Sequence, residues 1–146
     1  MDPIEVAKAL IRRFEGCYRG PYLCPAGVPT IGYGATYYED GTRVTLHDPI
    51  ITVERAEQLL LWHVENVYLP AVIQLCPGAK EPGMVAALID WTFNLGGSQL
   101  RGSTLRKRVN QGDLEGARVE LMKWVYAAGK RLRGLVARRA AEAALF

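Results

Sequence analysis

Cysteine and histidine are scarce in this sequence of 146 residues, which has three cysteines and two histidines. Three cysteines cannot all pair with one another, and there is no Cys-x-x-Cys motif. We therefore expect neither a disulfide framework nor a structural zinc site. A bridge between Cys17 and Cys24 stays open, although free thiols in a reducing compartment are the simpler expectation.

Long apolar runs are absent, because no segment approaches the roughly 18 residues that a membrane-spanning helix needs. The first 14 residues carry five charges, at Asp2, Glu5, Lys8, Arg12 and Arg13, unlike the apolar core of a secretory signal. Apolar residues make up 49% and charged residues 23% of the chain, a balance typical of globular proteins rather than disordered ones. We expect a soluble cytoplasmic protein that needs help to leave the cell.

Acidic side chains are few in the last third of the chain. Residues 1–100 hold 7 basic and 11 acidic side chains, whereas residues 101–146 hold 11 and 4. A basic third suits an anionic partner such as nucleic acid, a membrane surface or a cell-wall polymer. A solvated helix face accounts for the same charges, and the sequence alone does not choose.

The predicted order of elements is one helix, a small irregular antiparallel sheet and a helical lobe. The first helix covers residues 2–16, with Asp2 as its N-cap and Gly16 at its end. Prolines and glycines exclude a helix over residues 17–46, where "TIGYG" indicates a short strand.

Apolar residues recur at helical spacing after the sheet. Further helices are predicted over residues 52–68, where Pro70 ends the helix, and over residues 84–97, 103–113, 113–125 and 135–146, with a basic loop over 127–134. Repeats and linkers are missing. We expect one domain over residues 1–146, with a small β lobe at about 17–46 and a helical lobe at about 52–146.

Candidate chemistry lies where the first helix meets the predicted sheet. Glu15 falls in the last turn of that helix, and Cys24 and Thr30 flank a downstream turn that can bring them back toward it. An acid, a second titratable group and a hydroxyl suit hydrolysis of an acetal, in which one group protonates the leaving oxygen and another activates water or attacks. A lone acid at a helix end also fits a purely structural role.

The spacing Glu15-x8-Cys24-x5-Thr30 resembles the Glu-x8-Asp/Cys-x5-Thr signature of phage-type muramidases, glycoside hydrolase family 24, the family of the T-even phage lysozyme. Five segments, "FEG", "TIGYG", "TFNLG", "STL" and "GLVARRAAEAALF", are similar to family segments in the same order over nearly the whole chain. The resemblance implies a lysozyme-like α+β fold, with the active-site cleft between a small sheet lobe and a helical lobe.

The activity that the resemblance implies is that of an endolysin. Such an enzyme cuts the β-1,4 bond between N-acetylmuramic acid and N-acetylglucosamine in peptidoglycan, without a metal or an organic cofactor. The expected partner is therefore the glycan strand, for a monomer that binds no nucleic acid. Family members without an export signal accumulate in the host cytoplasm until a holin makes the membrane permeable.

Carried over by position, the resemblance makes Glu15 the general acid and Thr30 the residue that positions water. Cys24 stands at the second catalytic position, where better-known members have Asp. A free thiol has a pKa of about 8.5, and we expect Arg19, near in sequence, to favour the thiolate. The thiolate would act as a base, which inverts the anomeric centre, or as a nucleophile, which retains it.

Binding residues are also implied by the resemblance. Phe93 and Asn94 match a part of the fold that borders the cleft, so we expect them to touch glycan. A cation of the "GKRLRG" segment is expected to pair with Glu15, and Arg131 is our choice. The basic C-terminal helix could also contact an anionic membrane or outer-membrane surface through Arg138 and Arg139, although a core-packed final helix is the simpler hypothesis.

Three other functions compete with this one. A nucleic-acid-binding protein would use the basic third, but the acidic first hundred residues and the glycine-rich hairpin would stay unexplained. A wall-binding module that has lost catalysis would account for Cys24, yet Glu15 and Thr30 are intact. A lytic transglycosylase would need one acid only, and would leave an anhydro sugar.

Overall fold

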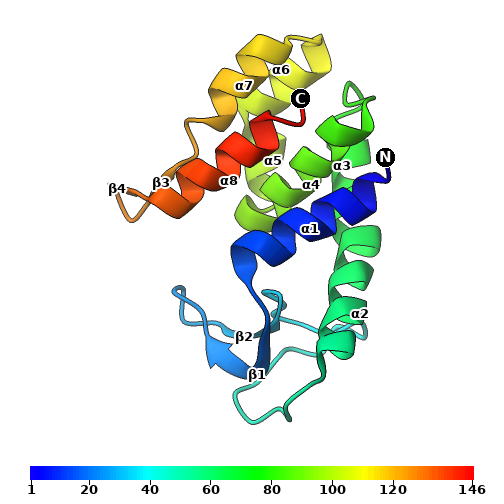
Figure 1. The fold of residues 1–146 in the computed structure, drawn as a ribbon, viewed down its shortest axis with the longest axis vertical. Coiled ribbons are helices and arrows are strands. Elements are labelled where there is room, and N and C mark those ends of the chain that lie inside the picture. The colour runs from blue at the N-terminus through cyan, green and yellow to red at the C-terminus, as the bar shows by residue number, and fades with distance from the viewer.

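The computed structural model describes residues 1–146 and divides them between a small β lobe and a larger helical lobe (Figure 1). Helices dominate, and the α+β class is confirmed. In chain order the elements are α1 (Pro3–Glu15), β1 (Tyr18–Leu23), β2 (Pro29–Gly32), α2 (Val53–His63), the π-helical segment η1 (Val64–Tyr68), α3 (Leu69–Leu75), α4 (Pro82–Leu95), α5 (Gly97–Gly102), α6 (Thr104–Gln111), α7 (Leu114–Leu121), β3 (Tyr126–Ala127), β4 (Lys130–Arg131) and α8 (Arg133–Ala143).

Helix α1 begins and ends as predicted. The Asp2 side chain accepts a hydrogen bond from the Ile4 N–H at 3.0 Å, which satisfies one of the free donors of the first turn. Gly16 adopts φ 72°, which most other residues avoid, and turns the chain out of the helix into β1. Glu15 is therefore the last helical residue, placed between the two lobes.

The small lobe is built on an irregular antiparallel pair of strands. Tyr22 of β1 pairs with Thr30 of β2, and the register shifts between Tyr18 and Tyr22. Isolated bridges then extend the pairing toward Arg43. This confirms the predicted small antiparallel sheet.

A cluster of polar side chains joins the small lobe to the helices. Glu57 of α2 accepts hydrogen bonds from Arg12 of α1 at 2.6 and 2.8 Å and from the Tyr33 hydroxyl at 3.0 Å. Burial and the bond to Glu57 raise the pKa of Tyr33 to about 12. One carboxylate thus connects α1, α2 and the loop after β2.

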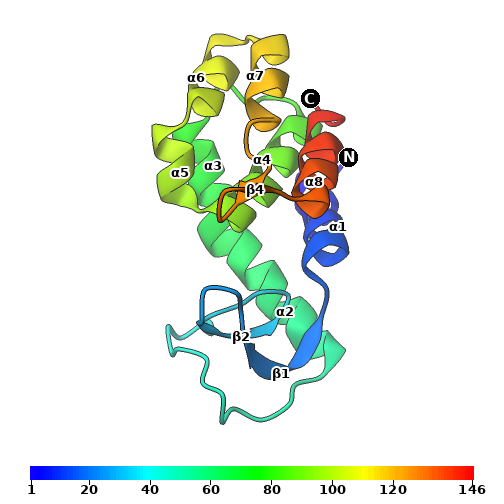
Figure 2. The ribbon, with the colours of Figure 1, turned by 90° about the vertical axis from the view of Figure 1, so that its left-hand side faces the viewer.

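The prediction that helix formation ends near Pro70 is wrong. Helix α3 continues through Pro70 to Leu75, so α2, η1 and α3 form one long rod that leads from the small lobe into the helical lobe (Figure 2). Proline lacks an N–H and its ring clashes with the carbonyl four residues earlier in an α-helix. The wider π-helical turn just before it, in which the Leu69 N–H reaches back to the Val64 carbonyl, accommodates the ring.

Helix α4 is the centre of the helical lobe, with nine of its residues buried. Helices α1, α3 and α8 pack against it. Gly96, at φ 95°, ends α4 as predicted. Ser103 and Asp113 cap α6 and α7 as predicted, by accepting hydrogen bonds from the N–H groups of Arg106 and Gly116.

Two elements differ from the predictions. The short helix α5 was not predicted, and the segment predicted as a basic loop contains the hairpin β3–β4. The hairpin turn is formed by Ala128 and Gly129, both with positive φ, at 50° and 78°. Such turns usually contain Asn-Gly or Asp-Gly, so "AAGK" does not signal one. No helix of the chain combines the length and the apolar character that crossing a bilayer requires.

Gly83 of α4 and Gly134 of α8 are each the second residue of their helix. Substituting them tests how closely α4 packs against the C-terminus. A Cβ on Gly83 would lie 2.6 Å from the backbone oxygen of Leu145, whereas a Cβ on Gly134 would meet no atom within 4 Å. We expect Gly83→Ala to lower the free energy of unfolding by about 1–3 kcal/mol through overpacking. Gly134→Ala should raise it by about 0.5–1 kcal/mol, since alanine loses less backbone entropy in a helix. Urea denaturation measures both, and a Gly83→Ala variant as stable as wild type would contradict the packing.

Candidate active site

Glu15 is held at the junction of the lobes by an arginine from the last helix. Its Oε1 accepts a hydrogen bond from Nη1 of Arg138 at 2.7 Å, and its side chain remains 25% exposed. The expectation that Arg131 pairs with Glu15 is therefore wrong. Arg131 lies exposed in β4 and makes no ion pair, because the chain turns back in the β3–β4 hairpin before α8 packs against α1.

Arg138 is itself held by Asp90 of α4. Its Nε and Nη2 donate to the two carboxylate oxygens of Asp90 at 2.9 and 2.8 Å, and both side chains are buried. Burial disfavours the charge of Arg138, but the carboxylates of Asp90 and Glu15 outweigh it and raise the pKa of the guanidinium. Asp90 was not among the predicted site residues. Its signal was a single acid inside the apolar helix segment "ALIDWT", since a buried charge needs a partner.

The burial of Arg138 and Arg139 also contradicts the predicted contact of the C-terminal helix with an anionic membrane surface. Arg138 is 4% exposed and Arg139 is fully buried. Neither side chain is available to an anionic membrane, so the expected contact through these two arginines is wrong. The cations that this part of the chain does expose are Lys130, Arg131 and Arg133.

Gly34 brings the backbone of the small lobe close to Glu15 and to helix α4. A Cβ at this position would lie 3.5 Å from Oε2 of Glu15 and 3.4 Å from the ring of Phe93, and the residue has φ 92°. Both distances are ordinary van der Waals contacts, so it is the backbone conformation that requires glycine here. Phe93 stacks in turn on Tyr68, with ring centroids 5.1 Å apart. The structure thus brings Phe93 next to Glu15.

Cys24 and Thr30 come together at the turn between the two strands. The Cys24 N–H donates to the Val28 carbonyl at 3.1 Å, and the Thr30 hydroxyl donates to the same oxygen at 2.8 Å. Hydrogen bonding with the backbone of Val28 lowers the pKa of the Cys24 thiol, and the Thr30 hydroxyl contributes in the same direction. The local backbone therefore favours the thiolate.

Arg19 does not contribute to this shift, contrary to the prediction. Its Nε donates to the Ile51 carbonyl at 2.8 Å, so its charge is directed to the loop before α2. Proximity in sequence was misleading because alternate residues of a strand point to opposite faces. All three cysteines are free: Cys17 is exposed and Cys76 is buried.

Tyr22 lies on the small lobe in a position where both the acid and the thiol affect its pKa. It lies on β1 opposite Thr30, and burial raises its pKa, with further contributions from the charges of Glu15 and Cys24. Its hydroxyl is therefore within electrostatic range of both groups. No motif pointed to Tyr22, although it lies on the segment that separates Glu15 from Cys24.

The remaining predicted binding residues have different surroundings. Asn94 follows Phe93 in the last turn of α4, and its side-chain oxygen is buried without a hydrogen-bond partner in the protein. Arg131 lies in the exposed β3–β4 hairpin. No group of three or more His, Cys, Asp or Glu side chains has an arrangement that could hold a metal ion.

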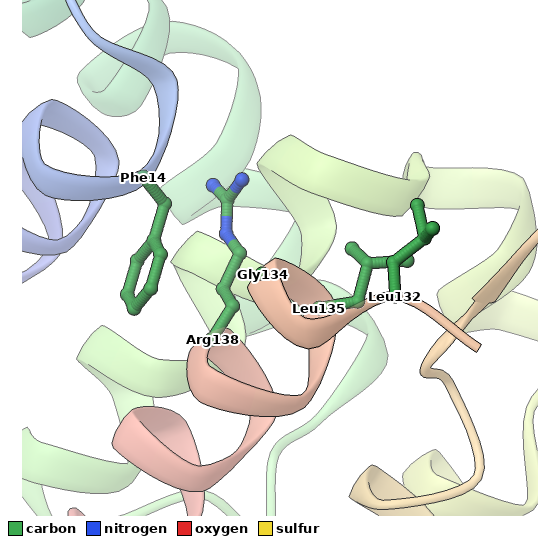
Figure 3. A pocket seen from close by; sticks show the side chains of 5 residues that line it. All are labelled: Phe14, Leu132, Gly134, Leu135 and Arg138. Carbon is green, nitrogen blue, oxygen red and sulfur yellow. The ribbon is translucent and has the colours of Figure 1, made fainter.

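A separate pocket of about 280 Å³ lies between the end of α1 and the start of α8. Its lining residues are Phe14, Leu132, Gly134, Leu135 and Arg138. Figure 3 shows Phe14 on α1 and Arg138 on α8 extending side by side into this region. The guanidinium carbon of Arg138 lies 5.5 Å from the centre of the Phe14 ring. Glu15, Cys24 and Thr30 are not part of this lining, so the pocket is only a neighbour of their site.

Comparison with known proteins places this geometry in a family. Residues 12–142 match the model of the family described as phage lysozyme. The chain belongs to the phage lysozyme family. It is 38% identical over 148 residues to an endolysin of Acyrthosiphon pisum secondary endosymbiont phage 1, with 97% of this chain and 95% of that protein covered. It is 32% identical to the SAR-endolysin of Escherichia phage Mu, with 97% and 79% covered.

The structural comparison agrees. The endolysin from Escherichia coli O157:H7 phage FAHEc1 superposes with a TM-score of 0.85 at 33% identity, over 99% of this chain and 92% of that one. The lysozyme-like α+β fold expected from the sequence is thereby confirmed. As a member of the phage lysozyme family, the protein is a glycoside hydrolase of the endolysin type.

Proposed function

We propose that this lysozyme hydrolyses the β-1,4 bond between N-acetylmuramic acid and N-acetylglucosamine in peptidoglycan, and so lyses the bacterial host. Glu15 is the general acid, Cys24 the base or nucleophile, and Thr30 the residue that positions water. The observation that supports this most strongly is that Arg138 holds the acid at the end of α1, while the Val28 carbonyl of the small lobe holds both the Cys24 N–H and the Thr30 hydroxyl.

The acid step follows from the surroundings of Glu15. The protonated carboxyl donates its proton to the glycosidic oxygen as the bond to the sugar breaks. This leaves a carboxylate, and the guanidinium of Arg138 lies 2.7 Å away to stabilise it. Because Asp90 holds that guanidinium at two points, little reorganisation is needed as the charge forms.

The second step needs a thiolate at Cys24. As a base, the thiolate would take a proton from a water that attacks the anomeric carbon; as a nucleophile, it would bond to that carbon until water replaces it. The Thr30 hydroxyl lies beside Val28 and Cys24 and has one proton to donate. Its oxygen lone pairs can accept a hydrogen bond from the attacking water.

The two lobes act together as one catalytic domain in this proposal, and the protein works as a monomer. Phe93 supplies an apolar face near Glu15, and the partly exposed Asn94, next to it in the last turn of α4, contacts the glycan. Arg131 contacts the more distant, anionic parts of the substrate from the exposed hairpin.

The role of Glu15 is tested by Glu15→Gln, which has nearly the same shape and no acidic proton. Hydrolysis of isolated gram-negative peptidoglycan, followed by turbidity, should fall by about 10²–10⁴-fold, while circular dichroism shows an unchanged fold. Mass spectrometry of the wild-type products should show reducing sugars. Anhydro sugars would instead identify a lytic transglycosylase, and binding without clearing by both proteins would identify a wall-binding module.

The role of Cys24 is tested by its pH dependence. The thiol must lose its proton to act, so kcat/KM of the wild type should fall as the pH falls below the thiol pKa. Cys24→Asp should stay active and keep its activity to lower pH, because an aspartate ionises at about pH 3.9. Cys24→Ala, of similar size but unable to ionise, is the control and should be nearly inactive. An active Cys24→Ala would remove Cys24 from the mechanism.

Release to the cell wall is part of the same proposal: the enzyme waits in the host cytoplasm until a holin opens the membrane. Some relatives have the name SAR-endolysin, so the alternative is release that needs no holin. Expression of the chain in Escherichia coli with and without a holin separates the two. Lysis should occur with the holin only, and lysis of cells that lack it would reject the proposed route.

A further inference from the structure

A second group of charged side chains lies buried behind Glu15, and the proposed chemistry uses only part of it. Asp90 comes from α4, and Arg138, Arg139 and Glu142 come from α8. Asp90, Arg139 and Glu142 are fully buried, and Arg138 is 4% exposed. Glu142 has no role in the mechanism described above, yet it interacts with Arg139 and with Asp90, the carboxylate that holds Arg138.

The hydrogen bonds of this cluster leave one carboxyl oxygen without a donor. Oε1 of Glu142 accepts from Nη2 of Arg139 at 2.8 Å, whereas Oε2 is buried and has no donor. Asp90 lies within hydrogen-bonding reach of Glu142 and already uses both of its oxygens for Arg138. Two buried carboxylates in contact repel each other, so a single proton between them is the stable arrangement.

The surroundings of Glu142 favour that proton. Burial raises the pKa of Glu142 well above its ordinary range, and the neighbouring Asp90 acts in the same direction. Arg139 opposes the shift, but its own charge is also disfavoured by burial. The other contact of Arg139 is the neutral Trp124 carbonyl, at 3.4 Å. Asp90 from α4 and Arg139 from α8 are thus the charged groups that directly contact the Glu142 carboxyl.

The protonation of Glu142 decides the charge that Glu15 faces. If Glu142 is neutral, the two arginines and Asp90 leave the cluster with one net positive charge, delivered to Glu15 by Nη1 of Arg138. If Glu142 is ionised, the cluster has no net charge. When Glu142 is neutral, the positive charge of the cluster balances the carboxylate that forms as Glu15 gives up its proton. When Glu142 is ionised, that carboxylate is an uncompensated negative charge in a partly buried site.

We propose that Glu142 is a neutral carboxylic acid that donates a hydrogen bond to Asp90 and, through Asp90 and Arg138, positions Glu15 beside one net positive charge. Glu142 is therefore a positioning residue and does not touch the substrate. This inference rests on the proposed role of Glu15 as the general acid.

The pH profile of Glu142→Gln tests the charge state. A glutamine is neutral, can donate to Asp90 and can accept from Arg139, so the alkaline limb of kcat/KM should coincide with that of wild type. If Glu142 is ionised in the wild type, the same substitution adds one positive charge. That charge favours the ionised form of Glu15 and moves the limb to lower pH, which would overturn the proposal.

Two further variants complete the series. Asp90→Asn removes one negative charge next to Arg138, so it should move the alkaline limb to lower pH. An unmoved limb would show that the cluster is not coupled to Glu15 and would also overturn the proposal.

Glu142→Ala removes the donor to Asp90, and kcat should fall at least tenfold with KM little changed. Activity that Glu142→Gln retains and Glu142→Ala loses shows that the hydrogen bond to Asp90 matters; equal losses would reject this role.

An infrared measurement is independent of activity and of the role of Glu15. At neutral pH the wild type should show the carbonyl band of a buried, protonated carboxylic acid, and this band should be missing in Glu142→Gln. A wild-type spectrum without the band would reject the neutral Glu142, even if Glu15→Gln is inactive. Conversely, a band that disappears in Glu142→Gln together with an active Glu15→Gln would reject the proposed acid and leave the protonated Glu142 in place.

Discussion

The buried guanidinium of Arg138 is the interaction on which the site depends. It donates twice to Asp90 of α4 and once to Glu15 at the end of α1, so three helices that are far apart in the sequence share one rigid fork of donors. A buried charge is costly unless it is paired, and loss of either carboxylate would leave the arginine short of partners. The position of Glu15 is therefore set by the same contacts that let the arginine be buried at all.

The small lobe supplies the other half of the site with very little regular structure. Two short strands and a tight turn hold Cys24 and Thr30 around the backbone of Val28. Hydrogen bonding with that backbone, and not a nearby cation, lowers the pKa of the thiol. Gly34 then allows this lobe to approach Glu15 without a side chain in between. The hydrogen bonds of Glu57 to Arg12 and Tyr33 connect the lobe to α1 and α2, so the two halves of the site are related by specific contacts.

The sequence predicted local features well, because their causes are local. Asp2, Gly16, Ser103 and Asp113 cap or end helices through hydrogen bonds and backbone angles within a few residues, and the pattern of prolines and glycines correctly indicated the small sheet. Predictions failed where a local signal was overridden or missing. Pro70 does not end its helix, because a π-helical turn before it accommodates the ring, and the hairpin turn at Ala128 and Gly129 lacks the residues that usually form one.

The sequence by itself determined the α+β class, most helix ends, and the spacing of Glu15, Cys24 and Thr30 that identified the family. Only the tertiary structure decided which cation holds the acid and what holds that cation. Arg138 and Glu15 are 123 residues apart, and Arg138 and Asp90 are 48 apart. Arg131 and Arg138 are equally basic in the sequence, and only the packing of α8 against α1 and α4 buries one of them and leaves the other exposed. The physical reason is that a charge acquires its partners through burial, and burial is a property of packed helices rather than of any one segment.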